Sequence, residues 1–184
     1  MLLSILLPTR NRRRRVVPLV QFLLANMPEQ MEGAWELVVL DNASEDGTGD
    51  KLRALSDPRM RVITNPQFLP TSEENVMNGL GHARGTFVWF LGDDDLPRVA
   101  AMQHMAHLLR ADTADLMVFN FRVMDQDGNL VSLTQVRGLS EDAELTMPQL
   151  IRRAGLINML SGWSIIVARR DMLDVKVMRA IMAH

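Results

Sequence analysis

The chain has 184 residues, of which 47% are apolar and 23% are charged, and its formal net charge is -2 at pH 7. These values are typical of a one-domain soluble globular protein, and they argue against a general binder of polyanions such as nucleic acid. The absence of cysteine excludes a disulfide framework and a thiolate metal site, and it fits a reducing cytosol. No apolar run approaches the roughly 20 residues that a membrane-spanning helix needs, and the apolar start is not expected to be a signal peptide.

The first part of the chain alternates short apolar runs with amphipathic stretches. We expect buried strands over residues 2–7, 35–40, 60–64 and 87–91, and helices over 16–27, 49–56, about 72–83 and about 97–110. The expected helix N-caps are Thr48 and either Thr71 or Ser72. Because strands and helices alternate with short connections, the pattern predicts an α/β fold with a Rossmann-like, mostly parallel sheet flanked by helices.

The pattern changes after residue 112. We expect a strand over 116–123, a turn over 125–129, a returning strand over 130–136, a helix over about 147–154, a loop and strand over 160–168, and a last helix over 171–183. The second half therefore adds a smaller mixed β region to the same domain.

Three consecutive carboxylates, Asp93, Asp94 and Asp95, follow the apolar run over 87–91 and Gly92. Like charges repel, so the cluster costs stability unless water or a cation neutralises it. An open α/β sheet binds ligands at the carboxyl ends of its strands, and Mg²⁺ is held by one or two carboxylates plus substrate phosphates. The alternative is a solvated acidic turn, and the tripeptide alone does not separate the two readings.

Two further features are expected at the same edge of the sheet. Asp41 ends its strand as Asp93 ends the later one, which favours a ligand role for both. Five arginines lie within residues 10–15. We interpret them as phosphate-attracting and solvated, with a nucleic-acid or acidic-lipid patch as the less favoured alternative. His104 and His107 are interpreted as surface or packing residues rather than metal ligands.

Four segments, in order along the chain, resemble motifs of the family-2 glycosyltransferases with the GT-A fold. They are residues 4–11 (SILLPTRN), 38–48 (VVLDNASEDGT), 78–95 with its Asn78-Gly79 and Ala83-Arg84-Gly85 steps, and 162–173 (GWSIIVARRDML). Each motif is weak alone, and their order over nearly the whole chain carries the resemblance. It implies one GT-A-like domain over 1–184, with a nucleotide-sugar-binding half over 1–111 and an incomplete acceptor-side half over 112–184.

The resemblance implies a metal-dependent, inverting glycosyltransferase that moves a sugar from a nucleoside diphosphate sugar to a sugar, lipid-linked or protein acceptor in polysaccharide or glycoconjugate synthesis. It implies a cytoplasmic protein with peripheral contact to the inner face of a membrane and no nucleic-acid partner. The donor-binding residues that it implies are Pro8, Thr9, Arg10, Asn11, Asp41, Arg84 and Asp93. Asp94 would be the main ligand of Mg²⁺ or Mn²⁺, with Asp95 supporting it.

The sequence departs from the family pattern at three places. Arg10 stands where an aromatic residue often stacks on the base, although a guanidinium also stacks. Gly92 stands where many members have the first carboxylate of the acidic motif. The general base is expected beyond His184, because Asp171 is interpreted as a helix-start residue. A nucleotide-sugar-binding module without turnover is therefore the alternative, and a nucleotidyltransferase is less favoured because residues 10–15 contain no glycine or lysine.

Overall fold

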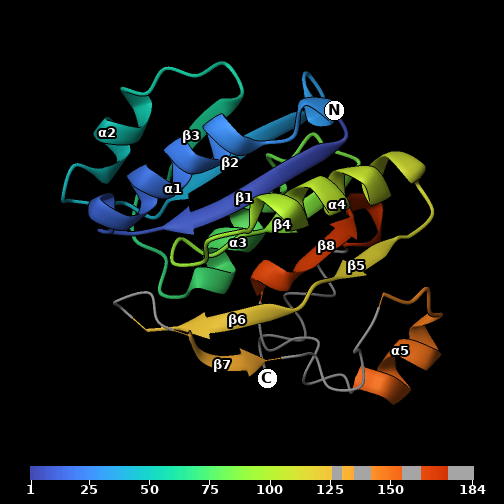
Figure 1. Ribbon diagram of the computed structural model, residues 1–184. Helices are drawn as coiled ribbons and strands as arrows, with labels where there is room; N and C mark the ends of the chain where they lie inside the picture. The colour runs from blue at the N-terminus through green and yellow to red at the C-terminus, as the bar shows by residue number, and fades with distance from the viewer. Residues whose placement is uncertain (126–129, 135–141, 155–162, 174–184) are drawn as a thin grey trace.

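The computed structural model describes residues 1–125, 130–134, 142–154 and 163–173. Within these ranges, six strands form a sheet of order β3-β2-β1-β4-β8-β5, and β6 pairs with β7 in a separate two-stranded sheet. The two-stranded sheet and α5 (Met147–Ala154) lie to one side of the large sheet (Figure 1). The predicted α/β architecture with a smaller β region in the second half is confirmed.

Four neighbouring strands of the large sheet run parallel to one another. They are β1 (Leu3–Thr9), β2 (Trp35–Asp41), β3 (Met60–Thr64) and β4 (Phe87–Phe90). Nearly every residue of β1, β2 and β4 is buried, as expected of apolar runs covered by helices on both faces. Thr9 is level with Asp41, and Asp41 is level with Thr64, so the carboxyl ends of three strands meet at one edge.

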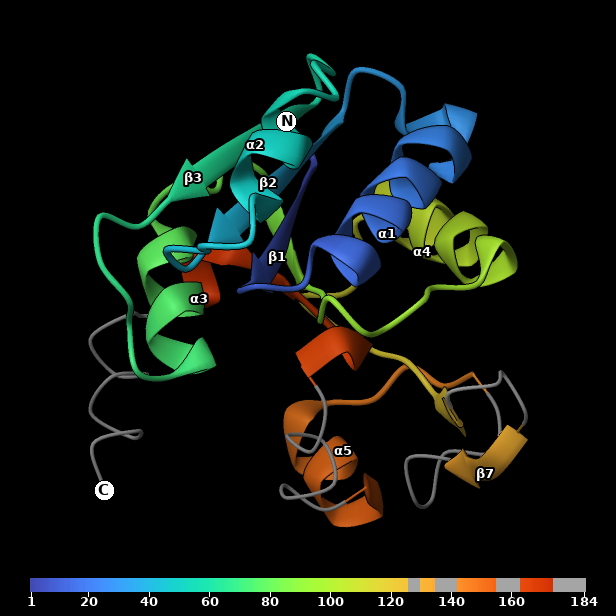
Figure 2. The same ribbon diagram turned by 90° about the vertical axis from the view of Figure 1, so that its left-hand side faces the viewer.

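Helices cover both faces of this sheet, as Figure 2 shows for α1 and α4 on one side and α3 on the other. Their bounds are α1 (Arg13–Asn26), α2 (Thr48–Arg53), α3 (Ser72–Leu80) and α4 (Val99–Ala111). Alternate residues of β1 point to opposite faces, so Ile5 packs in the core beneath α1 and α4, whereas Leu6 packs against α3. The predicted order of strands and helices is therefore confirmed through residue 111.

The helix starts differ from the sequence prediction at two places. α1 begins at Arg13, so three of the arginines belong to its first turn. Thr48 is the first residue of α2 and not its N-cap, because Gly47 caps the helix in a left-handed conformation with φ of 80°. The prediction for α3 is confirmed, since the Thr71 hydroxyl accepts a hydrogen bond from the backbone N–H of Glu74 at 3.1 Å.

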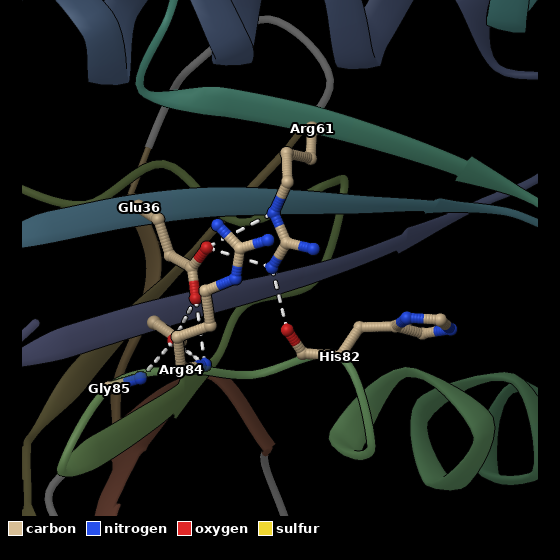
Figure 3. A network of polar contacts seen from close by, with 6 residues as sticks. Glu36, Arg61, His82, Arg84 and Gly85 are labelled. Atoms are coloured by element: carbon tan, nitrogen blue, oxygen red, sulfur yellow. Dashed lines mark hydrogen bonds and ion pairs between the residues drawn. The ribbon is translucent and has the colours of Figure 1, made fainter.

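A buried carboxylate ties four parallel strands together near their amino ends (Figure 3). Glu36 accepts hydrogen bonds from the Ser4 hydroxyl at 2.7 Å, the Arg84 backbone N–H at 2.8 Å and the Arg61 guanidinium at 2.8 Å. Arg61 also donates to the carbonyl of His82. Burial raises the pKa of Glu36, but these hydrogen bonds outweigh burial and lower this pKa below its ordinary value of 4.5.

The prediction of a single strand over 116–123 is wrong, because the chain divides there between two sheets. β5 (Leu116–Val118) pairs with β8 (Ile166–Arg169), which runs antiparallel to both β5 and β4. β6 (Phe121–Met124) pairs instead with β7 (Leu130–Thr134). Since β8 has only four residues, its partner strand ends early and the following apolar residues join the hairpin.

Three short 3-10 turns complete the description: η1 (Glu29–Met31), η2 (Trp163–Ile165) and η3 (Arg170–Met172). The helix predicted over about 147–154 is confirmed by α5. The predicted turn over 126–129, the end of the returning strand at 135–136 and the last helix from 174 onward lie outside the described residues. In the described part of the chain, no helix is both long and apolar enough to cross a membrane.

Candidate functional site

A cleft of about 420 Å³ opens at the carboxyl ends of the parallel strands, on the face that α3 covers. Its lining comes from the ends of β1, β2 and β4 and from the segment that leads into α3. The lining residues are Pro8, Thr9, Arg10, Arg12, Asn42, Phe68, Leu69, Pro70, Thr71, Ser72, Asn75, Val76, Phe90, Leu91, Gly92, Asp93 and Asp94. This is the edge at which an open parallel sheet binds ligands.

The charges of Asp93 and Asp94 are balanced in part by a single arginine, Arg12. Asp93 is only 7% exposed, and its two oxygens accept hydrogen bonds from the Thr9 hydroxyl at 2.7 Å and from Arg12 Nη1 at 2.6 Å. The same Arg12 nitrogen lies 3.1 Å from Asp94 Oδ2, and Asp94 is 52% exposed at the cleft. The negative charge of Asp93, and to a lesser extent its hydrogen bond, raises the pKa of the Arg12 guanidinium. Arg12 therefore keeps its positive charge.

The third carboxylate, Asp95, has Ser164 as its partner rather than Arg12. The Ser164 hydroxyl donates a hydrogen bond to Asp95 Oδ2 and accepts one from the backbone N–H of Gly92 at 2.8 Å. The Ser164 carbonyl accepts a bond from the indole N–H of Trp89 at 2.8 Å. In the described part of the chain, no group of three His, Cys, Asp or Glu side chains converges as a metal cage.

The same contacts explain the glycine at position 92. A Cβ atom there would lie 2.9 Å from Asp95 Oδ2, 3.1 Å from Asp94 Oδ1 and 3.3 Å from Ser164 Oγ. A carboxylate side chain at position 92 would therefore displace the side chains of Asp94 and Asp95. Ser164 was missed by sequence reasoning, because nothing local to it indicates a partner 69 positions away.

The loops after β1 and β2 are joined by hydrogen bonds, which fixes the backbone on both sides of Arg12. Asn11, with φ of 50°, donates its backbone N–H to Ser44 Oγ at 2.9 Å, and its side-chain oxygen accepts from the Glu45 N–H at 2.8 Å. Asp46 accepts from the Arg13 N–H at 3.2 Å. Asp46 also bonds the Thr48 N–H at 2.9 Å and the Thr48 hydroxyl, which is why Thr48 does not act as the cap.

A stacked pair also lines the cleft. The guanidinium carbon of Arg10 lies 3.8 Å from the centre of the Phe68 ring, and Phe68 is 50% exposed. Asn42 holds the loop in place, because its side chain bonds both the N–H and the carbonyl of Leu69 at 2.8 Å. Phe68 was not singled out from the sequence, although an exposed aromatic residue between two prolines was a usable signal.

Two predicted site residues lie away from the cleft. Asp41 is 1% exposed, is not among the lining residues, and accepts hydrogen bonds from the Thr64 hydroxyl and the Ser44 N–H, both at 3.2 Å. Arg84 lies at the opposite end of β4 from the acidic turn, where its backbone N–H bonds Ser4 Oγ at 3.0 Å. The structure thus brings Pro8, Thr9, Arg10, Asp93 and Asp94 together in the cleft lining and leaves Asp41 and Arg84 apart from them. Asn11 and Asp95 adjoin lining residues in the chain but are not part of the lining themselves.

The remaining candidates also lie elsewhere. Asp171 is in η3, which follows the last residue of β8. That end of β8 is level with the start of β4, so Asp171 lies at the sheet edge opposite the cleft. His104 is exposed and lies 3.3 Å from Asp142, and His107 is exposed on the same helix. The interpretation of both histidines as surface residues fits their exposure.

Residues 4–174 match the family model described as Glycosyl transferase family 2. The chain belongs to this family. The resemblance that its four motifs carry is thereby confirmed, and the sheet with its helices is the GT-A fold.

One curated relative within glycosyl transferase family 2 is the GalNAc(5)-diNAcBac-PP-undecaprenol beta-1,3-glucosyltransferase of Campylobacter jejuni. It is 27% identical over 176 residues, which are 95% of this chain and 53% of the relative. The family-2 chain therefore spans about half the length of this relative.

Two solved structures share the fold. A structure of TarS 1–349 from S. aureus in complex with UDP-GlcNAc is 18% identical, with a TM-score of 0.74 over 94% of this family-2 chain and 46% of TarS 1–349. The mannosyltransferase PcManGT from Pyrobaculum calidifontis, in complex with GDP-Man and Mn²⁺, is 21% identical, with a TM-score of 0.55 over 66% of this chain and 35% of that one.

Proposed function

We propose that this chain binds a nucleoside diphosphate sugar in the cleft and transfers its sugar to an acceptor. The observation that carries the proposal is the presence, in the lining of one cleft, of both a stacked Arg10–Phe68 pair and the Arg12–Asp93–Asp94 cluster. A flat apolar surface suits a nucleobase, and an arginine beside carboxylates suits a diphosphate with its cation. Membership of glycosyl transferase family 2 supports the reaction class.

We assign these two groups of lining residues to two parts of the donor. The base lies against the exposed ring of Phe68 and the Arg10 guanidinium, in the loop that Asn42 fixes. The ribose and the diphosphate lie near Thr9 and Asp93, at the end of β1. The predicted roles of Asp41 and Arg84 in donor binding stay predictions, and their positions favour support of the sheet instead.

The acidic turn suits a Mg²⁺ or Mn²⁺ site in which the substrate phosphates supply part of the coordination shell. Asp94 presents an exposed carboxylate at the cleft, and one or two carboxylates plus phosphate oxygens and water suit these ions. When bound, the cation neutralises the charge that develops on the diphosphate leaving group. We therefore propose Asp94 as the ligand, and Asp95 as a supporting carboxylate whose orientation Ser164 fixes. The Mn²⁺ in the PcManGT structure supports a cation in this fold.

The acceptor is proposed from the relatives alone. The relative from Campylobacter jejuni is named for an undecaprenol-linked acceptor, which supports a lipid-linked glycan acceptor and peripheral contact with a membrane for this chain. We keep the proposed division into a donor half over 1–111 and an acceptor half over 112–184, and we propose inversion at the transferred sugar.

The donor proposal is tested by thermal unfolding with a panel of nucleoside diphosphates and Mn²⁺. At a concentration near 100 Kd, the matching nucleotide stabilises the protein by about 2.7 kcal/mol, which raises the Tm by roughly 5–10 °C. Asp94→Asn keeps the shape of the side chain but removes its charge, so we expect it to lose most of this shift. Asp50→Asn is the matched control, because Asp50 is exposed on α2 and does not line the cleft.

The result would reject the proposal if no nucleoside diphosphate raised the Tm of the wild type, or if Asp94→Asn and Asp50→Asn gave the same shift.

A second candidate, a donor-binding module without turnover, is favoured by one observation: Asp171 lies at the opposite edge from the cleft. Binding without release of nucleotide from any sugar donor, with and without lipid-linked acceptors, would support this module.

A further inference from the structure

Arg12 occupies the space between the two carboxylates of the cleft. A single nitrogen, Nη1, lies 2.6 Å from Asp93 Oδ1 and 3.1 Å from Asp94 Oδ2. One positive atom between two carboxylate oxygens fills the position where a cation would neutralise both. Arg12 and a divalent cation therefore compete for the same oxygens.

We propose that Arg12 is a resident counter-ion of the acidic turn, displaced when the cation and the donor bind, and that it then binds the diphosphate. The inference rests on the proposed donor site and adds a second partner for Arg12. A cation alone has to displace the guanidinium without compensation. A cation that arrives with a diphosphate offers Arg12 new anionic oxygens, to which a guanidinium binds in bidentate fashion.

The surroundings of Arg12 allow the side chain to move without the backbone. The Arg12 carbonyl accepts hydrogen bonds from the Arg15 N–H at 2.8 Å and the Val16 N–H at 2.9 Å, so the main chain is fixed at the start of α1. The side chain is 45% exposed, and its described hydrogen bonds go to Asp93 and Asp94 alone.

Asp93 keeps its place when Arg12 leaves. Its other oxygen, Oδ2, accepts the hydrogen bond from the Thr9 hydroxyl at 2.7 Å, and Asp93 is nearly buried. The carboxylate therefore remains oriented toward the cleft after its arginine partner is gone. Among its described contacts, the Asp94 carboxylate has no second hydrogen-bond donor besides Arg12, so this exposed side chain can turn toward a cation.

A purely structural ion pair predicts a different response to mutation. If Arg12 only stabilised the turn, Arg12→Ala would disorder both carboxylates and weaken every ligand. If Arg12 is a competing counter-ion, its removal frees Asp93 and Asp94 for the cation and takes a binding group from the diphosphate. The two ligands then respond in opposite directions.

The experiment measures two affinities on the full chain. Binding of Mn²⁺ alone is followed by the loss of the free-ion signal in electron paramagnetic resonance, and binding of UDP in saturating Mn²⁺ is followed by calorimetry. We expect Arg12→Ala to lower the Kd for Mn²⁺ alone by about three- to tenfold, as for removal of a half-exposed competing charge. We expect the same variant to raise the Kd for UDP by about tenfold.

Arg14→Ala is the matched control, because Arg14 is exposed in the first turn of α1 and no described ion pair joins it to the acidic turn. It removes the same charge from the same segment, and we expect less than a twofold change in either Kd. Arg12→Lys keeps the charge without the planar fork, so it should retain weak Mn²⁺ binding but lose part of the UDP affinity.

The counter-ion proposal would be overturned if Arg12→Ala changed the Kd values for Mn²⁺ and UDP in the same direction, or changed them no more than Arg14→Ala does. Neither result would contradict the proposed donor site. A wild type that binds neither Mn²⁺ nor any nucleoside diphosphate of the panel would remove the donor site itself. Thermal unfolding of each variant without ligand separates a folding defect from a binding effect, and Arg12→Lys carries the test if Arg12→Ala unfolds.

Discussion

Among the glycines that the structure describes, Gly85 is the one where an added side chain would come closest to backbone atoms of its neighbours. A Cβ atom there would lie 2.5 Å from the backbone nitrogen of Ser4 and 2.7 Å from the carbonyl oxygen of Phe87. Backbone atoms in a paired sheet do not move aside as the end of a flexible side chain does. Gly81, four positions earlier, has ordinary right-handed dihedrals and a nearest atom at 3.7 Å.

These two glycines give a residue-scale prediction. Gly85→Ala should lower the free energy of unfolding by about 2–3 kcal/mol, because the added methyl overpacks β1 against β4. Gly81→Ala should change it by less than about 1 kcal/mol, and in the stabilising direction, because it restricts the unfolded chain. Urea titration of both variants measures the difference. Equal stability of the two variants would contradict the close approach at Gly85.

The first turn of α1 concentrates positive charge at the start of a helix. Arg13, Arg14 and Arg15 fill its first turn, that turn has no acidic residue, and its N-cap makes no side-chain hydrogen bond. Cations at a helix N-terminus each cost about 0.3–1 kcal/mol at low ionic strength. The helix is thus less stable than its length allows, and the cleft gains a positive potential at its rim.

The expected effect of reversing one of these charges follows from the dipole. Arg15→Glu places a carboxylate in the first turn, so we expect the free energy of unfolding to rise by about 0.5–1 kcal/mol and the Tm by roughly 1–4 °C. Arg15→Gln, which only removes the charge, should give about half of this gain. Differential scanning calorimetry at low and high salt measures it, since screening reduces the gain at high salt. A lower Tm for Arg15→Glu would show that Arg15 stabilises α1.

The Glu36 network acts on the whole molecule, because it joins β1, β2 and β3 to the segment before β4. The folded-state pKa of Glu36 lies below its ordinary value of 4.5. The stability that the ionised form contributes is therefore fully present above about pH 4.5 and is lost as the pH falls through the folded-state pKa.

We therefore expect Glu36→Gln to destabilise the fold by about 1–3 kcal/mol at pH 7, because it weakens the bond to Arg61 in a buried setting. The difference from the wild type should shrink as the pH falls below about 4.5. Thermal unfolding of both proteins between pH 3 and pH 8 provides the measurement. A difference that stayed constant with pH would mean that the charge of Glu36 adds nothing to stability.

Local signals made much of this fold predictable. The continuous apolar runs predicted the parallel strands, and the polar residues before α3 predicted an N-cap at Thr71 or Ser72, of which Thr71 is the cap. The residues that sequence reasoning missed act through distant partners. Glu36 lies inside an apolar run, but its partners lie 25 to 48 positions away, so its burial could not be inferred locally.

The candidate site was predictable to a similar extent and for the same reason. A strand that ends in carboxylates fixes the sheet edge, so the position of Asp93 and Asp94 followed from the topology. Arg84 precedes the same strand, so the topology already places it at the opposite end of β4 from the acidic turn, and only the family resemblance implied a donor role for it. Asp41 ends a strand as predicted, but alternation along β2 directs its side chain behind the cleft toward Gly49.

The support that Ser164 gives to the acidic turn has a consequence for the order of assembly. Ser164 comes 75 positions after its partner Trp89, and the carboxylates of the acidic turn lie near Trp89 in the chain. A ribosome releases the amino-terminal part first, so the parallel strands are available long before residue 164 is synthesised. We expect a nascent chain to reach a folded sheet with an unsupported acidic turn, and to acquire its finished geometry only when β8 inserts beside β4.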